Sequence, residues 1–407
     1  MTTPWLTLIG IGEDGRDGLS AAAQRLIDTA EFVMGGARHL ALIGKIKAET
    51  KAWPQPFDDG IKEIIARRGQ PTLILASGDP FLYGVGATLS HHIPANEMLV
   101  LPAPSAFSLM ASRLGWSIQD CAQVTLHGRP LEKIIPHLQP QARVLALSWD
   151  GDTPLKLATL LVERGMGESV IHIGEAMGGP REAHHRIIAK DLHATPQQFD
   201  PLNTIGLEVV TSHGARIVPL AAGLDESWFE HDNQITKREV RAITLSSLQP
   251  HQGALLWDIG AGSGSVSIEW MLCHPSNRAI AIEVRPDRAH RITRNALAFG
   301  FPDLRVIEDE APDALQGLPQ PDAIFIGGGG TDPRVIDHAL AALKLGGRLV
   351  VNAVTIETQA DLMKRHVAHG GTLIKIDIAR ADPVGPYHGW RASMPVIQWT
   401  FVKESAS

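Results

Sequence analysis

The chain has 407 residues, of which 44% are hydrophobic and 20% charged, and its formal net charge is −7. This composition is that of a globular protein with large apolar cores, and the length allows two or three domains. The acidic balance argues against a general binder of nucleic acid or of an anionic membrane surface. We therefore expect neither nucleic acid nor a membrane as a partner.

The cysteines and the N-terminus indicate a reducing compartment. Cys121 and Cys273 lie far apart and form no C-x-x-C motif, which argues against a disulfide framework or a thiolate metal site. The first residues lack a basic region followed by a long apolar stretch, and no apolar run reaches ~18 residues. The histidines show no ligand spacing such as H-E-x-x-H. We expect a cytoplasmic protein without a metal site.

Up to about residue 210, short apolar runs alternate with amphipathic stretches. Buried runs of this length, separated by helices, predict an α/β fold with a mostly parallel sheet. The expected strands are LTLIGI (6–11), TLILA (72–76), MLVLP (98–102), RVLALS (143–148) and SVIHIG (169–174), and the clearest helices cover 19–30 and 154–165.

The first expected strand runs into a G-x-G-x-x-G spacing formed by Gly10, Gly12 and Gly15. Between a strand and a helix, this spacing is typical of a dinucleotide-binding site, and hence of an oxidoreductase. That kind of site requires an acid at the end of the second strand, but EFVM (31–34) is followed by two glycines. Arg38 could instead meet a 2′-phosphate, so an NAD(P)-dependent oxidoreductase stays open as the alternative.

A stretch rich in Gly, Pro, Asp and Ser follows the first α/β series. We predict a linker over residues 213–227, which separates domains at 1–212 and 228–407. Directly after it, Thr236 and Glu239 have the spacing of a capping box, so Thr236 is expected to cap a helix.

The second half contains seven expected strands, the last two without a helix between them. This count and order predict a seven-stranded Rossmann-like sheet. The strands are ALLWDIG (254–260), RAIAIEV (278–284), LRVIEDE (304–310), DAIFIGG (322–328), GRLVVNAV (347–354), GTLIKIDIAR (371–380) and PVIQWTFV (395–402).

The first of these strands carries an acid, Asp258, ahead of three glycines at alternate positions. Glycine lets the backbone turn sharply and approach a ligand, and the helix that follows presents free N–H groups. Glu283 ends the next strand, where it can accept hydrogen bonds from ribose hydroxyls. A dinucleotide site would have Gly or Ala where this chain has Ser265. The acid also suits a ligand with an amino group, which favours S-adenosylmethionine, and the motif resembles class I methyltransferases.

Further motifs narrow this resemblance. ITKREVRAITL, DIGAGSGSVSIE, IEDEAPDAL and PDAIFIGGGG occur in the order found in methyltransferases of the cobalamin pathway, over about residues 228–403. The resemblance implies methylation of precorrin-6B at carbon 15, decarboxylation of its ring C acetate, and S-adenosylmethionine as cofactor. The expected cofactor-binding residues are Thr236, Asp258, Gly260, Ala261, Gly262, Ser263, Gly264, Glu283, Glu310 and Ala311.

Three features at the carboxyl ends of the later strands are candidates for contact with a macrocycle. Gly327 to Gly330 would let a flat ring lie against the backbone, and Thr331 is a candidate hydroxyl facing it. Tyr387 and Arg391, between the sixth and seventh strands, offer aromatic stacking and bidentate pairing with carboxylates. Asn352, at the end of the fifth strand, is the candidate polar partner for decarboxylation.

The first half carries its own set of motifs. SGDP (77–80) is accompanied by VMGGARHL, PAPSAFSLMASRLGW, VTLHGRP and TIGLEVV. In this order they resemble the tetrapyrrole methylase family over about residues 4–210, which implies two α/β lobes, S-adenosylmethionine in the cleft between them, and methylation at carbon 5. The implied cofactor-binding residues are Gly78, Asp79, Ser105, Ala106, Leu147 and Leu207.

The opening loop departs from that family. Glu13 and Asp14 follow the second glycine, where the family usually has proline. Two acids are expected to disfavour the close approach of a polycarboxylate. Arg129 is therefore the better candidate for pairing with a substrate acetate or propionate, with a structural ion pair as the alternative.

Together, these features predict a two-lobed tetrapyrrole methylase fold joined to a seven-stranded class I methyltransferase fold. The expected function is S-adenosylmethionine-dependent methylation of a precorrin at carbons 5 and 15 with decarboxylation, and the resemblance implies a homo-oligomer. Two alternatives remain: an NAD(P)-dependent oxidoreductase acting on a tetrapyrrole precursor, and a tetrapyrrole carrier without catalysis in the first half.

Overall fold

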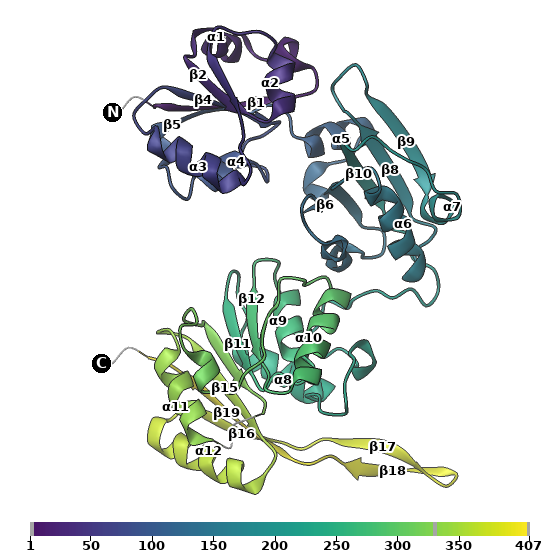
Figure 1. Cartoon of the computed structure of the whole chain (residues 1–407). Coiled ribbons are helices and arrows are strands. Elements are labelled where there is room, and N and C mark those ends of the chain that lie inside the picture. The colour runs from purple at the N-terminus through teal and green to yellow at the C-terminus, as the bar shows by residue number, and fades with distance from the viewer. Residues whose placement is uncertain (1–3, 329–331, 405–407) are drawn as a thin grey trace. The chain divides into compact units, whose positions relative to one another are not determined.

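The computed structural model describes residues 4–328 and 332–404, and it consists of two compact units, Met1–Ile217 (unit 1) and Val218–Ser407 (unit 2). Figure 1 colours the chain from purple at the start of unit 1 to yellow at the end of unit 2. The division falls inside the segment 213–227 that the sequence marks as a linker. No helix in the described part is long and apolar enough to cross a bilayer.

The first lobe of unit 1 is a five-stranded sheet in which every pair is parallel. Its inner strands are buried on both faces between helices, which is why they are continuous apolar runs in the sequence. The elements are β1 (Leu6–Ile11), α1 (Ala21–Thr29), β2 (Phe32–Gly35), α2 (Ala37–Ile43), β3 (Glu49–Ala52), α3 (Phe57–Ala66), β4 (Thr72–Ser77), α4 (Val85–Leu89) and β5 (Met98–Leu101), with sheet order β3-β2-β4-β1-β5.

The second lobe of unit 1 also has five strands, but its sheet is mostly antiparallel. Its elements are α5 (Ala106–Leu114), β6 (Cys121–Thr125), β7 (Arg143–Leu147), α6 (Thr153–Glu163), β8 (Val170–Glu175), β9 (Ala183–Ile188), α7 (Ala189–Ala194) and β10 (Asn203–Glu208), with sheet order β6-β7-β10-β8-β9. The prediction of a mostly parallel sheet is therefore wrong for this lobe. The reason is that residues 176–182 join β8 to β9 without a helix, and a connection this short joins antiparallel neighbours.

The opening glycine motif does not form a dinucleotide turn. Gly10 lies inside β1, where a Cβ atom would stand 1.8 Å from the carbonyl oxygen of Gly78. Helix α1 begins only at Ala21, with the side chain of Ser20 as its N-cap. The third glycine, Gly15, therefore begins a short 3₁₀ turn (Gly15–Gly18) rather than the helix that would receive a pyrophosphate.

Unit 2 is built on a seven-stranded sheet, as the sequence predicts. Its elements are α8 (Arg238–Leu248), β11 (Leu255–Ile259), α9 (Ser265–Leu272), β12 (Arg278–Ile282), α10 (Pro286–Ala298), β13 (Arg305–Ile307), β14 (Ala323–Ile326), α11 (Pro333–Ala342), β15 (Arg348–Ala353), α12 (Ile356–His369), β16 (Thr372–Ile376) and β19 (Val396–Val402). The sheet order is β13-β12-β11-β14-β15-β19-β16, and only β19 runs antiparallel to its neighbours.

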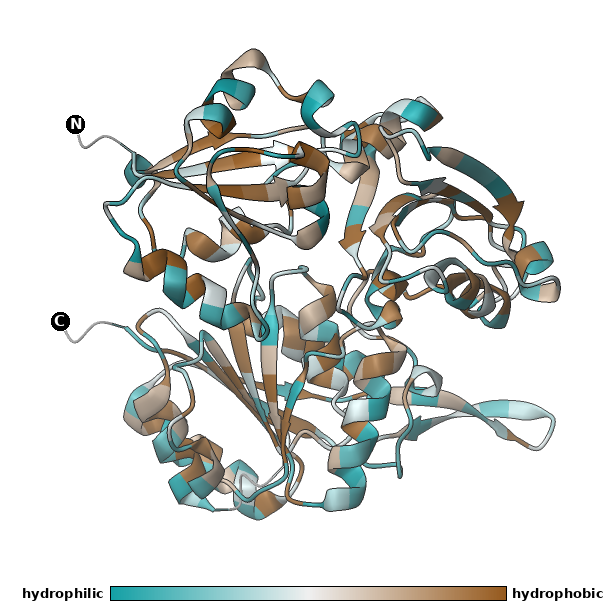
Figure 2. Cartoon of the chain, turned by 45° about the horizontal axis from the view of Figure 1, so that its top comes forward, coloured by the Kyte–Doolittle hydropathy of each residue, from teal (hydrophilic) through white to brown (hydrophobic). Residues whose placement is uncertain are grey.

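The core of unit 2 forms because alternate side chains of β11 point to opposite faces of the sheet. Leu255, Trp257 and Ile259 face one apolar cluster with α11 and α12. Asp258 faces the opposite side and bonds to α9. Figure 2 shows the strands of this sheet mostly brown, which marks their apolar residues.

A hairpin of β17 (Ala379–Val384) and β18 (Tyr387–Ala392) interrupts the path from β16 to β19. It leaves the sheet at Ile376 and returns at Val396, which is paired with Ile376. Since β16 is parallel to β11, this exit point lies at the same sheet edge as the end of β11. Figure 1 shows the hairpin in yellow, extending away from that sheet.

The chain that enters unit 2 is held by a fully buried ion pair between Arg241 of α8 and Glu269 of α9, with Nε–Oε1 at 2.6 Å. Glu269 also accepts hydrogen bonds from the backbone N–H groups of Gly223 (2.7 Å) and Leu224 (3.0 Å). Arg241 donates in addition to the carbonyl oxygens of Leu224 and Thr236. These residues pack into unit 2 rather than forming a free linker.

The predicted cap of α8 is corrected by one residue. Lys237, not Thr236, is the N-cap, and no side chain caps this helix end. Glu239 pairs instead with Arg380 of β17. The carbonyl of Thr236 is engaged by Arg241, which holds the residue before the cap in place of a capping box.

The buried pair gives a testable prediction. Replacing Arg241 by Met leaves the Glu269 charge buried without its cation, so we expect unit 2 to lose about 3–5 kcal/mol of its free energy of unfolding. As control, Arg294→Gln breaks the exposed pair with Glu230 and should cost less than about 1 kcal/mol. Denaturant titrations of the full chain, read by hydrogen exchange of unit 2 peptides, measure both. Equal losses in the two variants would contradict the role assigned to Arg241.

Candidate functional site

Unit 1 contains a cleft of about 1010 Å³ that residues of both lobes line. It lies at the carboxyl ends of β1 and β4, where open α/β sheets bind ligands. Five of the six cofactor-binding residues expected in this unit line it; they are Gly78, Asp79, Ser105, Ala106 and Leu147.

Local geometry explains why these residues face the cleft. Gly78 follows β4 with a φ of +52°, and a Cβ there would stand 2.9 Å from the carbonyl oxygen of Pro104. The carboxylate of Asp79 accepts a hydrogen bond from the backbone N–H of Phe81 at 2.9 Å, which closes the turn. Ser105 caps α5 by accepting the N–H of Ser108 with its hydroxyl, and this start of the helix, Ser105 and Ala106, lines the cleft.

Leu207 is the exception. It lies in β10 opposite Val144, and its side chain is fully buried in the core of the second lobe. On the same strand, Thr204 pairs with Leu147 and lines the cleft instead. Arg129 does line the cleft, together with His127.

The acid pair of the opening loop does not present two free charges to the cleft. Glu13 is mostly buried and forms ion pairs with Arg38, which follows β2, and with Arg181 (3.6 Å), which follows β8. The carboxylate of Asp14 folds back over the backbone of Gly18. The expected repulsion of a polycarboxylate is therefore offset for Glu13 by two guanidinium groups.

His39 stands beside this ion pair, with Nε2 at 2.8 Å from the hydroxyl of Ser77 and 3.0 Å from Arg38. Burial, and next the charge of Arg38, lower the pKa of His39 to about 4. The imidazole ring of His39 is therefore neutral at pH 7. The positive charge on this side of the cleft comes from Arg38 and Arg181.

In unit 2, the glycine loop after β11 (residues 260–264) has a backbone conformation and a close backbone contact that favour glycine. Gly260, Gly262 and Gly264 have φ values of +70°, +62° and +74°, a region that favours glycine. A Cβ at Gly260 would stand 2.5 Å from the carbonyl oxygen of Gly328, at the end of β14. The loop can approach this closely because Gly260 lacks a side chain, whereas a Cβ at Gly328 would stand 3.6 Å from the carbonyl oxygen of Gly260, which is an ordinary contact.

Two acids flank the loop. Asp258 is buried, and its Oδ2 accepts hydrogen bonds from the N–H (3.0 Å) and hydroxyl (2.7 Å) of Ser267. Burial raises the pKa of Asp258 to about 6 against these hydrogen bonds, and the charge of Glu283 adds to the rise. Glu283 accepts from the N–H groups of Gly262 (2.8 Å) and Arg285 (3.1 Å).

Unpartnered buried atoms indicate that this loop is built to receive a ligand. Oδ1 of Asp258 and the hydroxyl of Ser263 are buried without a hydrogen-bond partner. A buried polar atom without a hydrogen bond lowers the stability of the folded protein, unless a ligand supplies the missing donor or acceptor. A ligand with an amino group and hydroxyls supplies such partners, so the residues present fit S-adenosylmethionine.

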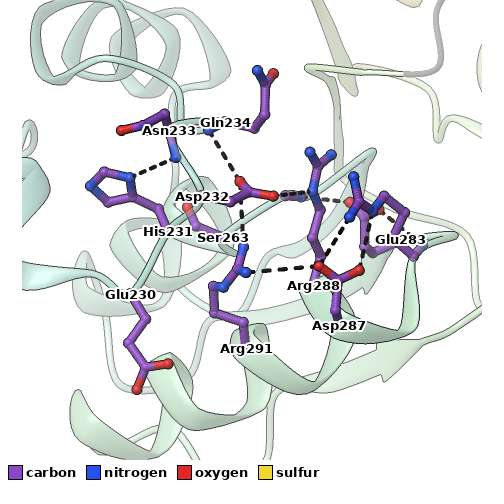
Figure 3. Close-up of polar contacts among 12 residues, drawn as sticks. Glu230, His231, Asp232, Asn233, Gln234, Ser263, Glu283, Asp287, Arg288 and Arg291 are labelled. Atoms are coloured by element: carbon purple, nitrogen blue, oxygen red, sulfur yellow. Dashed lines mark hydrogen bonds and ion pairs between the residues drawn. The ribbon is translucent and has the colours of Figure 1, made fainter.

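The other expected cofactor residues surround the same sheet edge. Thr236 lies just before α8, with its carbonyl held by Arg241. Glu310 and Ala311 follow β13, and the side chain of Glu310 is exposed. The sequence patterns missed a further element, the segment from Glu230 to Thr236 and its ion pairs with α10, which Figure 3 shows. No motif marks it, because its partners lie 56 residues or more further along the chain.

The macrocycle candidates of unit 2 are less closely grouped. Gly327 and Gly328 follow β14 beside the glycine loop, whereas Gly329, Gly330 and Thr331 lie outside the described residues.

Asn352 lies in β15 and its amide is engaged by neighbours. It donates to the hydroxyl of Thr244 at 2.9 Å and accepts from the amide of Gln398 at 2.9 Å. Tyr387 and Arg391 stand on the hairpin, where the exposed fraction of Tyr387 is 76%. Arg391 pairs with Asp382 across the hairpin at 3.1 Å. The partners of Asn352 and Arg391 are Thr244, Gln398 and Asp382, none of which belongs to the glycine loop.

Comparisons with known proteins find matches to both units of the chain. Residues 5–192 match the family of tetrapyrrole (corrin/porphyrin) methylases, and residues 227–403 match the precorrin methyltransferase domain. A precorrin-6Y C(5,15)-methyltransferase [decarboxylating] of Sinorhizobium sp is 55% identical over 405 residues, which are 99% of this chain and 97% of that protein.

Two shorter proteins of Salmonella typhimurium each match 44% of this chain. One is a cobalt-precorrin-6B C(15)-methyltransferase (decarboxylating), 34% identical with 95% of its length covered. The other is a cobalt-precorrin-7 C(5)-methyltransferase, 32% identical with 89% of its length covered.

The fold and the two matched domains define a tetrapyrrole methyltransferase made of two different α/β units. The chain belongs to the precorrin-6Y C(5,15)-methyltransferase (decarboxylating) family. These matches give no support to the oxidoreductase alternative.

The raised pKa of Asp258 predicts a pH dependence of stability. Its folded pKa of about 6 lies above its ordinary value of 3.8, so the folded state keeps a proton that the unfolded state has lost. The free energy of unfolding of unit 2 should therefore fall by roughly 3 kcal/mol between about pH 4 and pH 6 from this group alone. Asp258→Asn should remove this part of the dependence, measured by denaturant titrations of both proteins across that range. Identical pH profiles would show that Asp258 titrates normally.

Proposed function

We propose that this chain methylates precorrin-6B (precorrin-6Y) at carbon 5 in unit 1 and at carbon 15 in unit 2, with S-adenosylmethionine as donor in both. Unit 2 also decarboxylates the ring C acetate. The observation that carries the proposal is the presence of two separate sites at the carboxyl ends of parallel strands, each built around a close glycine contact. The division of the two named methylations between two Salmonella proteins supports it.

In unit 2, we assign Asp258 to the amino group of the cofactor and Glu283 to its ribose. Each carboxylate oxygen of Glu283 accepts a hydrogen bond from one backbone N–H group. The remaining lone pairs of these oxygens can accept from the ribose hydroxyls. Thr236, Glu310 and Ala311 complete the enclosure. When bound, S-adenosylmethionine supplies a methyl group activated by its sulfonium.

The chain's own contribution to methyl transfer is alignment and exclusion of water. With S-adenosylmethionine bound, the loops would hold its methyl group in line between the sulfur and the acceptor ring carbon, so that the methyl could pass to carbon while the bonding pair stays on sulfur and one proton is released from the macrocycle. No covalent enzyme intermediate is required, so orientation of the two reactants can supply ~7–11 kcal/mol of the barrier reduction. Backbone-lined loops suit this task because they leave room for both reactants.

In unit 1, the cleft of about 1010 Å³ has the size of a site for a large ligand. Gly78, Asp79, Ser105 and Ala106 hold the cofactor at the carboxyl ends of β1 and β4. Arg129, on the wall contributed by the second lobe, pairs with an acetate or propionate of the substrate.

Decarboxylation of the ring C acetate breaks the bond between the carboxylate and its methylene carbon, and the electron pair passes into the conjugated macrocycle. We assign Tyr387 and Arg391 to substrate recognition in unit 2 and Asn352 to a polar contact at the same sheet edge. The exit of the hairpin from the carboxyl edge of the sheet supports this assignment.

Separate glycine variants test the division of labour. Gly260→Ala places a methyl group against the Gly328 backbone and should lower carbon 15 methylation and decarboxylation by ~100-fold, because the reacting groups are misaligned. Gly78→Ala should do the same to carbon 5 methylation alone. Mass spectrometry of products formed from precorrin-6B by the full chain measures both.

The matched control is Gly253→Ala. Gly253 also has a left-handed φ of +78°, but a Cβ there meets no atom closer than 3.9 Å. The Gly253→Ala variant should keep both activities, because it places a side chain on a left-handed backbone conformation but creates no close contact. Loss of both methylations in either site variant would contradict the assignment of one reaction to each unit.

Arg129 gives a prediction for the substrate. Arg129→Gln should raise the KM for the precorrin by ~10-fold or more in carbon 5 methylation, with the KM for S-adenosylmethionine unchanged, because one charge-assisted hydrogen bond is lost. The control is Arg113→Gln, which breaks the exposed pair with Glu182 away from the cleft lining. Steady-state kinetics decide the question, and an unchanged precorrin KM would leave Arg129 without a role in substrate binding.

A further inference from the structure

The segment from Glu230 to Thr236, here called the cover segment, lies directly over the glycine loop of unit 2. The carbonyl oxygen of Gln234 is 3.1 Å from the position that a Cβ of Gly262 would take. Figure 3 shows the segment beside Ser263 and Glu283, with the side chain of Asp232 turned toward α10 and those of Asn233 and Gln234 turned away from it. A ligand in the glycine loop would therefore sit next to this segment.

Asp232 fastens the middle of the cover segment to α10. Its Oδ2 is 2.9 Å from Nε of Arg288, and its Oδ1 is 3.4 Å from Nη1 of Arg291. Oδ1 also accepts the backbone N–H of Gln234 at 3.2 Å, so the carboxylate holds the segment's own turn. Although burial opposes it, the hydrogen bond from Arg288 helps to lower the pKa of Asp232 to about 2. The carboxylate of Asp232 is therefore charged at every physiological pH. We call its ion pairs with Arg288 and Arg291 the clasp.

The two ends of the cover segment are fixed independently of Asp232. The amide of Asn295 donates to the carbonyl oxygens of Glu230 (3.0 Å) and Ser263 (2.9 Å), which ties the start of the segment to the glycine loop. At the other end, the fully buried Arg241 holds the carbonyl of Thr236. Asp232 differs from these anchors because its side chain is 27% exposed. It can open without disrupting a buried core.

We propose that Asp232 is a positioning residue whose ion pairs with Arg288 and Arg291 keep the cover segment closed over the cofactor of unit 2, and thereby set how tightly S-adenosylmethionine is retained. The inference rests on the proposed function, since it assumes that the cofactor occupies the glycine loop. When the ion pairs of Asp232 break, the middle of the cover segment can move while its two ends stay fixed. This movement lets the cofactor and its product leave the glycine loop. Asp232 itself touches neither reacting atom.

The test is hydrogen exchange of the full chain during titration with S-adenosylmethionine. Peptides that contain the glycine loop report occupancy of unit 2 separately from unit 1, and peptides of the cover segment report its closure. In Asp232→Asn, we expect the concentration for half-protection of the glycine loop to rise about tenfold. We expect the cover segment to exchange faster without cofactor, and by a larger factor than peptides of the central sheet of unit 2.

The matched control is Glu230→Gln. Glu230 lies in the same segment and pairs with the same helix through Arg294, but that pair is exposed and its backbone stays held by Asn295. This variant should shift half-protection by less than about twofold. Asp232→Glu, which keeps the charge, should restore most of the wild-type affinity. If Asp232→Asn does not fold, Arg288→Gln removes the main partner from the other side and carries the same expectation.

The outcomes separate the two claims. Absence of protection of the glycine loop in the wild-type chain would overturn the cofactor assignment and this inference with it. Protection in the wild type with the same half-protection concentration in Asp232→Asn would overturn the inference alone. A fall in unit 2 stability without a shift in half-protection would likewise overturn it, because it would show a purely structural role.

Discussion

The buried ion pair between Arg241 and Glu269 is the interaction on which the cofactor side of unit 2 depends. Removing two charges from water costs several kcal/mol each, and the cost is offset only when further hydrogen bonds satisfy both groups. Here the carboxylate accepts from the backbone of Gly223 and Leu224, and the guanidinium donates to the carbonyl of Leu224, ahead of the cover segment, and to that of Thr236, its last residue. The pair therefore fixes the path of the chain into the unit. Thr236 and the clasp at Asp232 take their positions from that path.

Both units solve the same physical problem with backbone rather than side chains. In unit 1 the β1 strand and the turn after β4 meet at Gly10 and Gly78, and in unit 2 the ends of β11 and β14 meet at Gly260 and Gly328. A Cβ atom at Gly10, Gly78 or Gly260 would stand less than 3.0 Å from backbone atoms, so glycine is required at these three positions by contact. The result is a pair of sheet edges where a flat ligand can approach the main chain. This shared construction is compatible with two unrelated folds and one type of chemistry.

The sequence predicted the features that repeat locally and missed those that depend on distant partners. The seven strands of unit 2 were predicted from short apolar runs in the sequence. The loop after Asp258 was predicted from the spacing of its glycines. The antiparallel order of the second lobe did not, because β9, with its two histidines, lacks an apolar run. The clasp at Asp232 was invisible, since an acid in a polar segment looks like any solvated residue until α10 brings Arg288 beside it. Leu207 lies in a stretch that resembles the family, yet the register of β10 places Thr204, not Leu207, at the cleft.

The central claim is that one chain carries two independent cofactor sites. The most direct measurement is the stoichiometry of S-adenosylmethionine bound to the intact chain, by native mass spectrometry or by equilibrium dialysis at saturation. We expect two molecules per chain, falling to one when either glycine contact is disrupted. A stoichiometry of one in the unmodified chain would contradict it, because one of the two sites would then have no cofactor to use.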